Sequence, residues 1–354
     1  MVTATGTRAV CSKGGDPLEP PRRQEIFFSF FMFTADLQPD NPDYTKLLAQ
    51  HIRELSSYGY DGFDLPIAPT SAADHSAEIQ SYVDLKRRLT DLGLGEVRIS
   101  TNVATTRRFD PTSPYREQRD AALSYLRSRI DITAALGGSL MAGPVIFPYN
   151  AYPETEDGQP IWSDALQEWV KPGYARAHSI ISELGGYAGE RGITVGIEPV
   201  DHWEQAAPNL VGDVADFLEG FSGADVGVCI DSSHVTLGSE GPETFRRQVA
   251  RLAPDRRISS IHLSAPDRGQ LADSWIPWRT FLDPILPVYD GPFLVEVFNA
   301  IPAFVNSFRL TRRKFWIPGE DAPVSGVPDA YTVAAEAIST VRTELSQFIP
   351  ASLS

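Results

Sequence analysis

Four polar side chains interrupt apolar stretches in the second half of this 354-residue chain at nearly regular intervals. They are three acids and one imidazole, and successive members are 33, 31 and 34 residues apart: Glu198, Asp231, His262 and Glu296. Each lies at or near the end of a short apolar run typical of a buried β-strand. Three carboxylates at one point would repel one another unless a cation joined them. The spacing therefore predicts one divalent metal ion held by these four residues.

The ligand types indicate which ion to expect. Oxygen ligands with one nitrogen suit Mn²⁺ best, with Mg²⁺ or Co²⁺ as alternatives, rather than an ion that prefers thiolates. The chain has only two cysteines, Cys11 and Cys229, which excludes a disulfide scaffold and a cysteine-rich zinc site. Any one of the four residues taken alone could equally be a helix cap or a salt-bridge partner. Their regular recurrence at the ends of apolar runs favours the metal site.

Eight short apolar runs alternate with longer amphipathic stretches, the pattern typical of a (β/α)8 TIM barrel with one buried parallel sheet. The expected strands are Ile26–Phe33, Gly62–Pro66, Val97–Val103, Leu140–Ile146, Thr194–Pro199, Val226–Ile230, Ile258–Leu263 and Phe293–Phe298. The expected helices are Tyr44–Tyr58, Ala77–Leu92, Tyr115–Leu136, Gln167–Arg191, Leu210–Phe221, Pro242–Leu252, Trp278–Val288 and Tyr331–Phe348. A doubly wound open sheet is the alternative, but no glycine-rich phosphate loop follows the first strand.

The chain divides into a short lead and one domain. Residues 1–23 contain several glycines and prolines but no apolar core of a signal peptide, so we expect a flexible N-terminal lead. Residues 24–354 form the single barrel domain. Two loops are longer than a barrel needs: Pro148–Asp164 after the fourth strand, and an insertion at residues 300–328 after the eighth. Both leave the carboxyl ends of strands, where barrel enzymes keep their active sites.

Composition excludes several classes of protein. Lys and Arg number 31 against 46 Asp and Glu, a net charge of −15 that disfavours a nucleic-acid binder. A multi-zinc DNA-repair nuclease would also need more than the six histidines present. No apolar run is long enough to cross a membrane, and two cysteines fit a reducing cytoplasm. We therefore expect a cytoplasmic protein with no nucleic-acid or membrane partner.

Two further polar residues follow the expected ligands at short offsets. His234 lies three residues after Asp231, and Arg268 lies six residues after His262. A neutral imidazole and a guanidinium are good hydrogen-bond donors to sugar hydroxyls and to oxygen that gains charge. Alone, His234 could bond to loop backbone and Arg268 to its neighbour Asp267. Their offsets from the ligands favour a role in substrate binding.

These segments resemble the xylose-isomerase-like TIM barrel superfamily, and within it the D-tagatose/D-allulose 3-epimerase branch. The matching motifs are Gly196-Ile197-Glu198-Pro199, Asp231 to His234, His262 to the Asp267-Arg268-Gly269 triplet, and Glu296. By this resemblance Glu198, Asp231, His262 and Glu296 are the metal ligands, and Glu198 and Glu296 are also the catalytic acid–base pair. His234, Arg268 and Glu204 would hold sugar oxygens. The chain departs from the branch at Ala265-Pro266, where an acidic-polar pair is common.

The resemblance implies a metal-dependent carbohydrate isomerase or epimerase. Such an enzyme abstracts the proton next to the carbonyl of a keto-sugar, and the metal stabilises the resulting enediolate. The chain also resembles the large (alpha) subunit of C-glycoside deglycosidases, carbon–carbon lyases that cleave 3-oxo-glycosides by metal-assisted elimination together with a small beta subunit. The expected ligand is thus a sugar or a glycoside, and the expected assembly is a homo-oligomer or a hetero-oligomer with a small beta subunit. A non-catalytic sugar-binding protein would not need four convergent metal ligands.

Overall fold

The structure is a computed structural model that describes residues 23–298 and 315–348, apart from residues 35, 69, 71–73, 160, 162, 163, 224 and 239. The expected N-terminal lead lies outside the described residues except for Arg23. Residues 300–314 of the expected insertion also lie outside them, whereas residues 315–328 are described.

Eight parallel strands close into a barrel in which every strand pairs with its neighbours in chain order, and β8 pairs with β1. The predicted (β/α)8 barrel is thereby confirmed. The strands are β1 (Ile26–Ser29), β2 (Gly62–Pro66), β3 (Arg98–Asn102), β4 (Leu140–Gly143), β5 (Thr194–Ile197), β6 (Val226–Asp231), β7 (Ile258–Ser264) and β8 (Phe293–Glu296).

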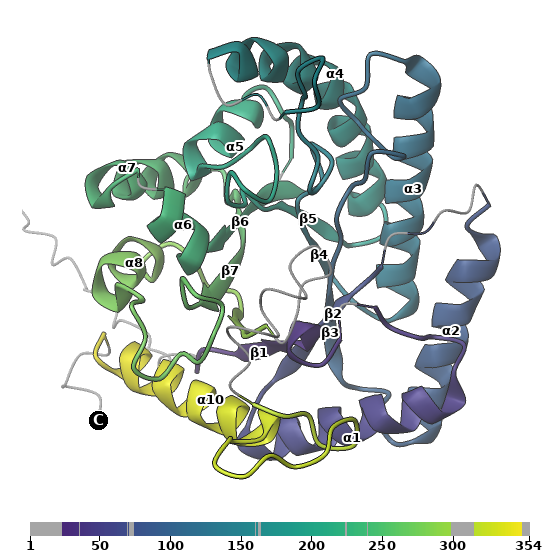
Figure 1. Ribbon diagram of the computed structural model, residues 1–354, viewed down its shortest axis with the longest axis vertical. Helices are drawn as coiled ribbons and strands as arrows, with labels where there is room; N and C mark the ends of the chain where they lie inside the picture. Colours follow the sequence, from purple (N-terminus) through teal and green to yellow (C-terminus); the bar gives the residue numbers. More distant parts are fainter. Residues whose placement is uncertain are drawn as a thin grey trace, which may run out of the picture.

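Helices surround this barrel and follow one another in chain order (Figure 1). They are α1 (Pro42–Tyr58), α2 (Ser76–Asp91), α3 (Arg116–Ala135), α4 (Asp164–Gly189), α5 (Val211–Phe217), α6 (Ser232–Gly238), α7 (Pro242–Leu252), α8 (Trp278–Ile285) and α10 (Ala330–Ser346). Local sequence explains several ends. The side chain of Asn41 caps α1, and that of Asp329 caps α10. Gly93, Gly137 and Gly192 have positive φ just after α2, α3 and α4.

The structure differs from the expected elements most at two places, and several other strand and helix ends shift by a few residues, such as β8, which ends at Glu296 and not at Phe298. The first apolar run is a strand only to Ser29, and residues Phe30–Met32 form a 3₁₀ turn, η1, because the Ser29 hydroxyl accepts a hydrogen bond from the Phe31 amide. The segment after Asp231 forms the short helix α6, which apolar periodicity did not reveal because its buried residues, Ser232 to His234, are polar. Polar residues buried at the barrel mouth hide the pattern that sequence analysis relies on.

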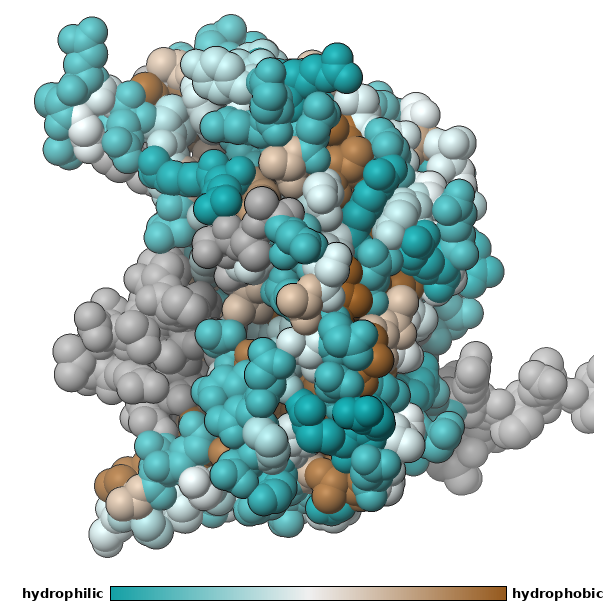
Figure 2. All heavy atoms as spheres, turned by 90° about the vertical axis from the view of Figure 1, so that its right-hand side faces the viewer, coloured by the Kyte–Doolittle hydropathy of each residue, from teal (hydrophilic) through white to brown (hydrophobic). Residues whose placement is uncertain are grey.

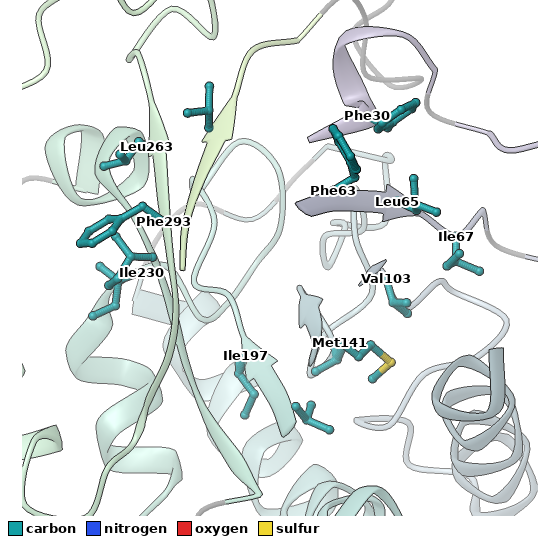
Figure 3. Packing of buried hydrophobic residues seen from close by; sticks show 14 of the residues in the cluster. Phe30, Phe63, Leu65, Ile67, Val103, Met141, Ile197, Ile230, Leu263 and Phe293 are labelled. Carbon is teal, nitrogen blue, oxygen red and sulfur yellow. The ribbon is translucent and has the colours of Figure 1, made fainter. Parts of the chain in front are cut away.

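The main core fills the space between the sheet and its helices. Phe63, Ile230, Leu263 and Phe293 are buried on strands spread around the barrel (Figure 3). Burying a side chain of this size contributes roughly 1.5–3 kcal/mol each. The strands, and the residues at their ends, are therefore held firmly in place from outside the barrel.

The outer surface seen from the side of α2 and α3 is largely hydrophilic, with hydrophobic side chains only in small areas (Figure 2). None of the helices in the described ranges combines the length and the apolar composition needed to cross a lipid bilayer.

Gly143 ends β4 with φ +131°, and a Cβ added there would collide with the backbone carbonyl oxygen of Val103. Its own carbonyl accepts a hydrogen bond from the amide of Glu198 at 3.0 Å. We expect Gly143→Ala to lower the free energy of unfolding by at least about 2 kcal/mol, because both the space and the backbone conformation require glycine. Chemical denaturation measures this.

The matched control is Gly186→Ala on the exposed side of α4, where an added Cβ meets no atom within 4 Å. This substitution should be neutral or stabilise the protein by up to about 1 kcal/mol, as alanine does in helices. Equal unfolding free energies for the two variants would contradict the analysis.

Candidate functional site

The four predicted metal ligands converge at the carboxyl-terminal mouth of the barrel. One ligand atom from each of Glu198, Asp231, His262 and Glu296 lies within 4.8 Å of the others, and all four side chains are buried. Glu198 directly follows β5, Asp231 ends β6, His262 lies in β7 and Glu296 ends β8. The structure therefore brings together all four residues that the spacing singled out.

Their positions in the sheet are staggered, although the nearly constant separation along the chain would suggest equivalent places on neighbouring strands. Asp231 pairs directly with His262, but the register neighbour of Glu296 is Ser264, two residues beyond His262. Strands of a barrel tilt against its axis, so residues at one height shift in register from strand to strand. The nearly constant spacing in sequence therefore predicts that the four side chains meet at the mouth of the barrel. It does not predict which residues pair on neighbouring strands.

The imidazole of His262 is oriented with one nitrogen toward the acids. Its Nδ1 lies 3.3 Å from Glu198 Oε1 and 3.6 Å from Glu296 Oε1, and it has no hydrogen-bond partner among the residues that the structure describes. A buried nitrogen without a partner, facing two buried carboxylates, fits a cation between them. The donor set of three carboxylates and one imidazole is the one expected for Mn²⁺ or a similar ion.

Asp231 is anchored by several donors. Its Oδ1 accepts hydrogen bonds from the Ser264 hydroxyl and from the Ser233 amide, each at 2.6 Å, and its Oδ2 accepts one from Arg268 Nη1 at 2.9 Å. Burial alone would raise the pKa of Asp231, but the positive charge of Arg268 and the two nearby histidines outweigh burial and hold it below its usual range. Asp231 is therefore a carboxylate fixed in one orientation.

The two glutamates differ in their electrostatic surroundings. Burial raises the pKa of Glu296 well above its usual range, and the positive charge of His262 offsets this only in part. Burial also opposes ionisation of Glu198, but there the positive charge of His262 prevails and lowers its pKa. Two carboxyl groups at one point with unequal affinity for a proton are suited to giving and taking protons.

The three predicted substrate-binding residues lie together beside this cluster. His234 Nε2 is 2.7 Å from Arg268 Nη2 and 3.8 Å from Glu198 Oε1, and Glu204 Oε1 is 3.8 Å from Arg268 Nη2. Burial and Arg268 act to lower the pKa of His234, yet Asp231 and the other surrounding carboxylates raise it to about 9. Burial also raises the pKa of Glu204.

Arg268 is held in a backbone conformation that is uncommon for its residue type. Its φ is +57°, its amide donates to the Ala265 carbonyl at 2.7 Å, and its carbonyl accepts from the Phe298 amide at 3.0 Å. The guanidinium carbon lies 5.1 Å from the centre of the Phe298 ring. A left-handed residue other than glycine costs roughly 1–2 kcal/mol, so the surrounding contacts must outweigh this strain.

A cavity of about 330 Å³ opens above the cluster. Of the four predicted metal ligands, only Glu198 and Glu296 line it; Glu204, His234 and Arg268 also belong to its wall. The rest of the wall consists mainly of apolar or small side chains, with three neutral polar ones: Phe31, Pro66, Ile67, Ala68, Asn102, Ala104, Pro144, Tyr149, Asn150, Val200 and Phe298.

Sequence analysis missed three residues that hold the site together. Asp201 Oδ2 lies 3.2 Å from His234 Nδ1, Ser264 bonds both Asp231 and Arg268, and Cys229 Sγ lies 3.2 Å from His262 Nε2. Burial raises the pKa of the Cys229 thiol to about 12. Strand alternation contained a usable signal, because Cys229 and Ser264 each lie two residues from a predicted ligand on the same strand.

A further buried carboxyl lies within the barrel wall on β2. Asp64 accepts a hydrogen bond from the Ser100 hydroxyl at 2.6 Å, and its other oxygen has no partner among the described residues. Burial raises the pKa of Asp64 to about 6, although the positive charge of His262 acts to lower it. Ionisation of Asp64 therefore opposes folding at neutral pH.

A closed (β/α)8 barrel with buried acids and an imidazole at its mouth has the architecture of barrel enzymes, which keep their active sites at this end. The family model for the xylose isomerase-like TIM barrel matches residues 52–314, and the chain belongs to this family. A curated relative, an L-ribulose 3-epimerase of Methylomonas sp. (strain DH-1), is 23% identical over 201 residues, which are 55% of this chain and 63% of that protein. The chain thus spans less than two thirds of that relative's length.

Solved structures share the fold over nearly the whole chain. A protein of Anabaena variabilis, assigned provisionally as a sugar phosphate isomerase/epimerase, is 51% identical with a TM-score of 0.88, covering 92% of this chain and 99% of its own. A D-allulose 3-epimerase from Methylomonas sp., solved with D-allulose, superposes with a TM-score of 0.69 at 18% identity, covering 92% of this chain and 98% of its own. The fold is that of sugar isomerases and epimerases.

The raised pKa of Asp64 predicts a pH-dependent difference between the wild type and Asp64→Asn in metal-free protein. The unfolded carboxyl ionises near pH 4 and the folded one near pH 6, so the stability of the wild type relative to the variant falls as pH rises through this window. Between pH 5 and pH 8 the change is about 1 kcal/mol. Denaturant unfolding at the two pH values measures it.

Asp255→Asn, at an exposed position, is the control for the loss of one carboxylate. A difference between the wild type and Asp64→Asn that stays constant from pH 5 to pH 8 would show that Asp64 ionises normally.

Proposed function

We propose that this protein is a metal-dependent carbohydrate epimerase that removes and returns the proton next to the carbonyl of a ketose. The observation that carries this proposal is that two of the four clustered residues face the cavity and the other two do not. Asp231 and His262 lie behind the cavity wall, whereas Glu198 and Glu296 face the cavity. A pair of carboxylates at the wall of a cavity, backed by two further ligands, matches what two-sided proton transfer at a sugar carbon requires.

The residues at the mouth fit one divalent ion, with Mn²⁺ as our assignment. Glu198, Asp231, His262 and Glu296 would hold it, as the unpartnered Nδ1 of His262 between two carboxylates supports. When bound, the ion supplies positive charge that makes the proton next to a carbonyl more acidic by several kcal/mol.

Glu198 and Glu296 carry out the proton transfer in this proposal. One carboxylate takes the proton from carbon, the electron pair of the broken C–H bond moves toward the carbonyl oxygen, and an enediolate results. The other carboxyl group returns a proton to the opposite face, which inverts the centre.

His234, Arg268 and Glu204 would bind the oxygen atoms of the substrate. All three line the cavity beside the two glutamates and are buried. A substrate hydroxyl that enters the cavity would displace solvent and bind side chains that are already in position. Arg268 is further fixed by Asp231 and Ser264, which keeps its guanidinium pointing into the site. A substrate held by these groups leaves the carbon next to its carbonyl within reach of the glutamates.

The apolar part of the cavity wall favours a second candidate activity. Phe31, Ile67 and Val200 offer a surface that fits an aglycone better than it fits sugar hydroxyls, which would lose hydrogen bonds there. The same proton removal from a 3-oxo-glycoside, followed by departure of the group at the β position, would make the protein the large subunit of a C-glycoside deglycosidase with a small beta subunit as partner.

Glu198→Gln and Glu296→Gln should each lower the rate of ketose epimerisation by about 10²–10⁴-fold, because an amide cannot take or give the proton. Steady-state turnover of free ketoses, followed by chromatography of the epimers, measures this. Glu243→Gln, at an exposed position on α7, is the matched control and should retain full activity.

Removal of divalent ions with a chelator should abolish turnover, and Mn²⁺ should restore it. Parallel assays on free ketoses and on 3-oxo-C-glycosides, with the beta subunit added where one is found, separate the two activities. Efficient epimerisation of ketoses would exclude the deglycosidase. Inertness toward ketoses together with cleavage of the glycoside would overturn our first proposal, and full activity after chelation would overturn both.

A further inference from the structure

Cys229 is fully buried on β6, two residues before Asp231, and its Sγ lies 3.2 Å from Nε2 of His262. We propose that Cys229 is a positioning residue: its sulfur accepts the Nε2–H of His262 and thereby presents Nδ1, unprotonated, to the metal. The inference rests on the metal site proposed above. It concerns a residue that neither the spacing of the ligands nor the wall of the cavity pointed to.

The two nitrogens of His262 face different surroundings. Nδ1 faces Glu198 and Glu296 and has no hydrogen-bond partner in the described part of the chain, whereas Nε2 contacts Cys229. A nitrogen that binds a metal must be unprotonated, so the proton of the neutral ring has to sit on the other nitrogen. A buried N–H without an acceptor is costly, and the hydrogen bond that the structure describes for Nε2 is the one to Cys229.

The same geometry argues against Cys229 as a metal ligand. Glu198, Cys229 and His262 also form a set of potential ligand atoms within 4.8 Å of one another. However, the sulfur contacts Nε2 while the carboxylates of Glu198 and Glu296 face Nδ1, so an ion among the acids lies at the opposite edge of the ring. A single ion cannot bind Nδ1 among the glutamates and also bind the thiol, because the thiol lies at the other nitrogen of the ring.

Sulfur is an unusual partner for such a ring. Histidines that bind metals generally donate their second N–H to a carboxylate, a backbone carbonyl or water, and loss of this partner costs about 10–100-fold in metal affinity or activity. A thiol is a weaker acceptor than these oxygens. At the base of a cluster that already holds three acids, a neutral sulfur fixes the ring without adding a fourth negative charge.

The test compares Cys229→Ser, Cys229→Ala and Cys229→Val in the full-length protein. Serine keeps a polar acceptor, alanine removes it, and valine removes it while nearly preserving volume. Val228→Ala, also buried on β6, controls for a general weakening of the strand. Mn²⁺ affinity is measured by competition with a chelator, and the hydrogen bond from Nε2–H of His262 is followed by the ¹H chemical shift and solvent exchange of that proton in ¹⁵N-edited NMR of metal-free protein.

We expect Cys229→Ala and Cys229→Val to bind Mn²⁺ about 10–100-fold more weakly than the wild type. The affinity of Cys229→Ser should lie between that of the wild type and that of these two variants, and the affinity of Val228→Ala should be unchanged. In the NMR spectrum the Nε2–H proton of the wild type should exchange slowly with solvent, and the alanine and valine variants should lose this protection. If Cys229→Ala is too unstable to purify, Cys229→Val and Cys229→Ser carry the comparison.

Two results would overturn the inference. One is unchanged Mn²⁺ affinity and an unchanged Nε2–H signal of His262 in Cys229→Val. The other is a thiolate-to-metal charge-transfer band in the Co²⁺-loaded wild type that disappears in Cys229→Ser, which would make Cys229 a ligand. If the wild type binds no metal but the Nε2–H signal of His262 depends on Cys229, the proposed function fails while the role of Cys229 in orienting His262 stands.

Discussion

Mutual repulsion among buried carboxylates is the constraint on which this site depends. Five acids are buried around the barrel mouth: Glu198, Asp201, Glu204, Asp231 and Glu296. Within the described residues, the cationic groups in contact with them are Arg268 and, when protonated, His234 and His262. Charges brought out of water in such numbers persist only when each has a partner. The contacts of Arg268 to Asp231 and of His234 to Asp201 satisfy part of this requirement, and the space between Glu198 and Glu296 is where a further positive charge belongs.

The closed barrel makes that crowding possible. Strands packed from outside by apolar side chains such as Ile230 and Leu263 do not move apart when like charges meet at their ends. Hydrogen bonds across strands then orient individual groups: Ser264 on β7 bonds Asp231 on β6, and the amide of Glu198 bonds the carbonyl of Gly143. The stability of the apolar layer thus supports a mouth whose own electrostatics oppose folding.

The barrel could be predicted from sequence because its strands are nearly continuous apolar runs and several helices end at glycine. The four converging residues could also be predicted, since each ends or interrupts such a run at the interval of one β/α unit. Glu204 was available only through resemblance to a family. The stagger between Asp231 and Glu296 could not be read, because barrel tilt is a property of the closed sheet. Strand alternation places Cys229 on the same face as Asp231, but the roles of Asp201 and Cys229 depend on which nitrogen of a histidine they meet, and a sequence does not show ring orientation.

The backbone around Arg268 has a consequence for anyone who wishes to redesign the substrate range. The carbonyl of Arg268 accepts a hydrogen bond from the amide of Phe298, and its amide donates one to the carbonyl of Ala265. These two bonds fix the six-residue step from His262 to Arg268 relative to the chain that follows β8. Insertions or deletions inside that step would displace the guanidinium from Asp231. The exposed stretch around Trp275 follows this step in the sequence and takes no part in these two hydrogen bonds, so loop grafts that enlarge the mouth belong there.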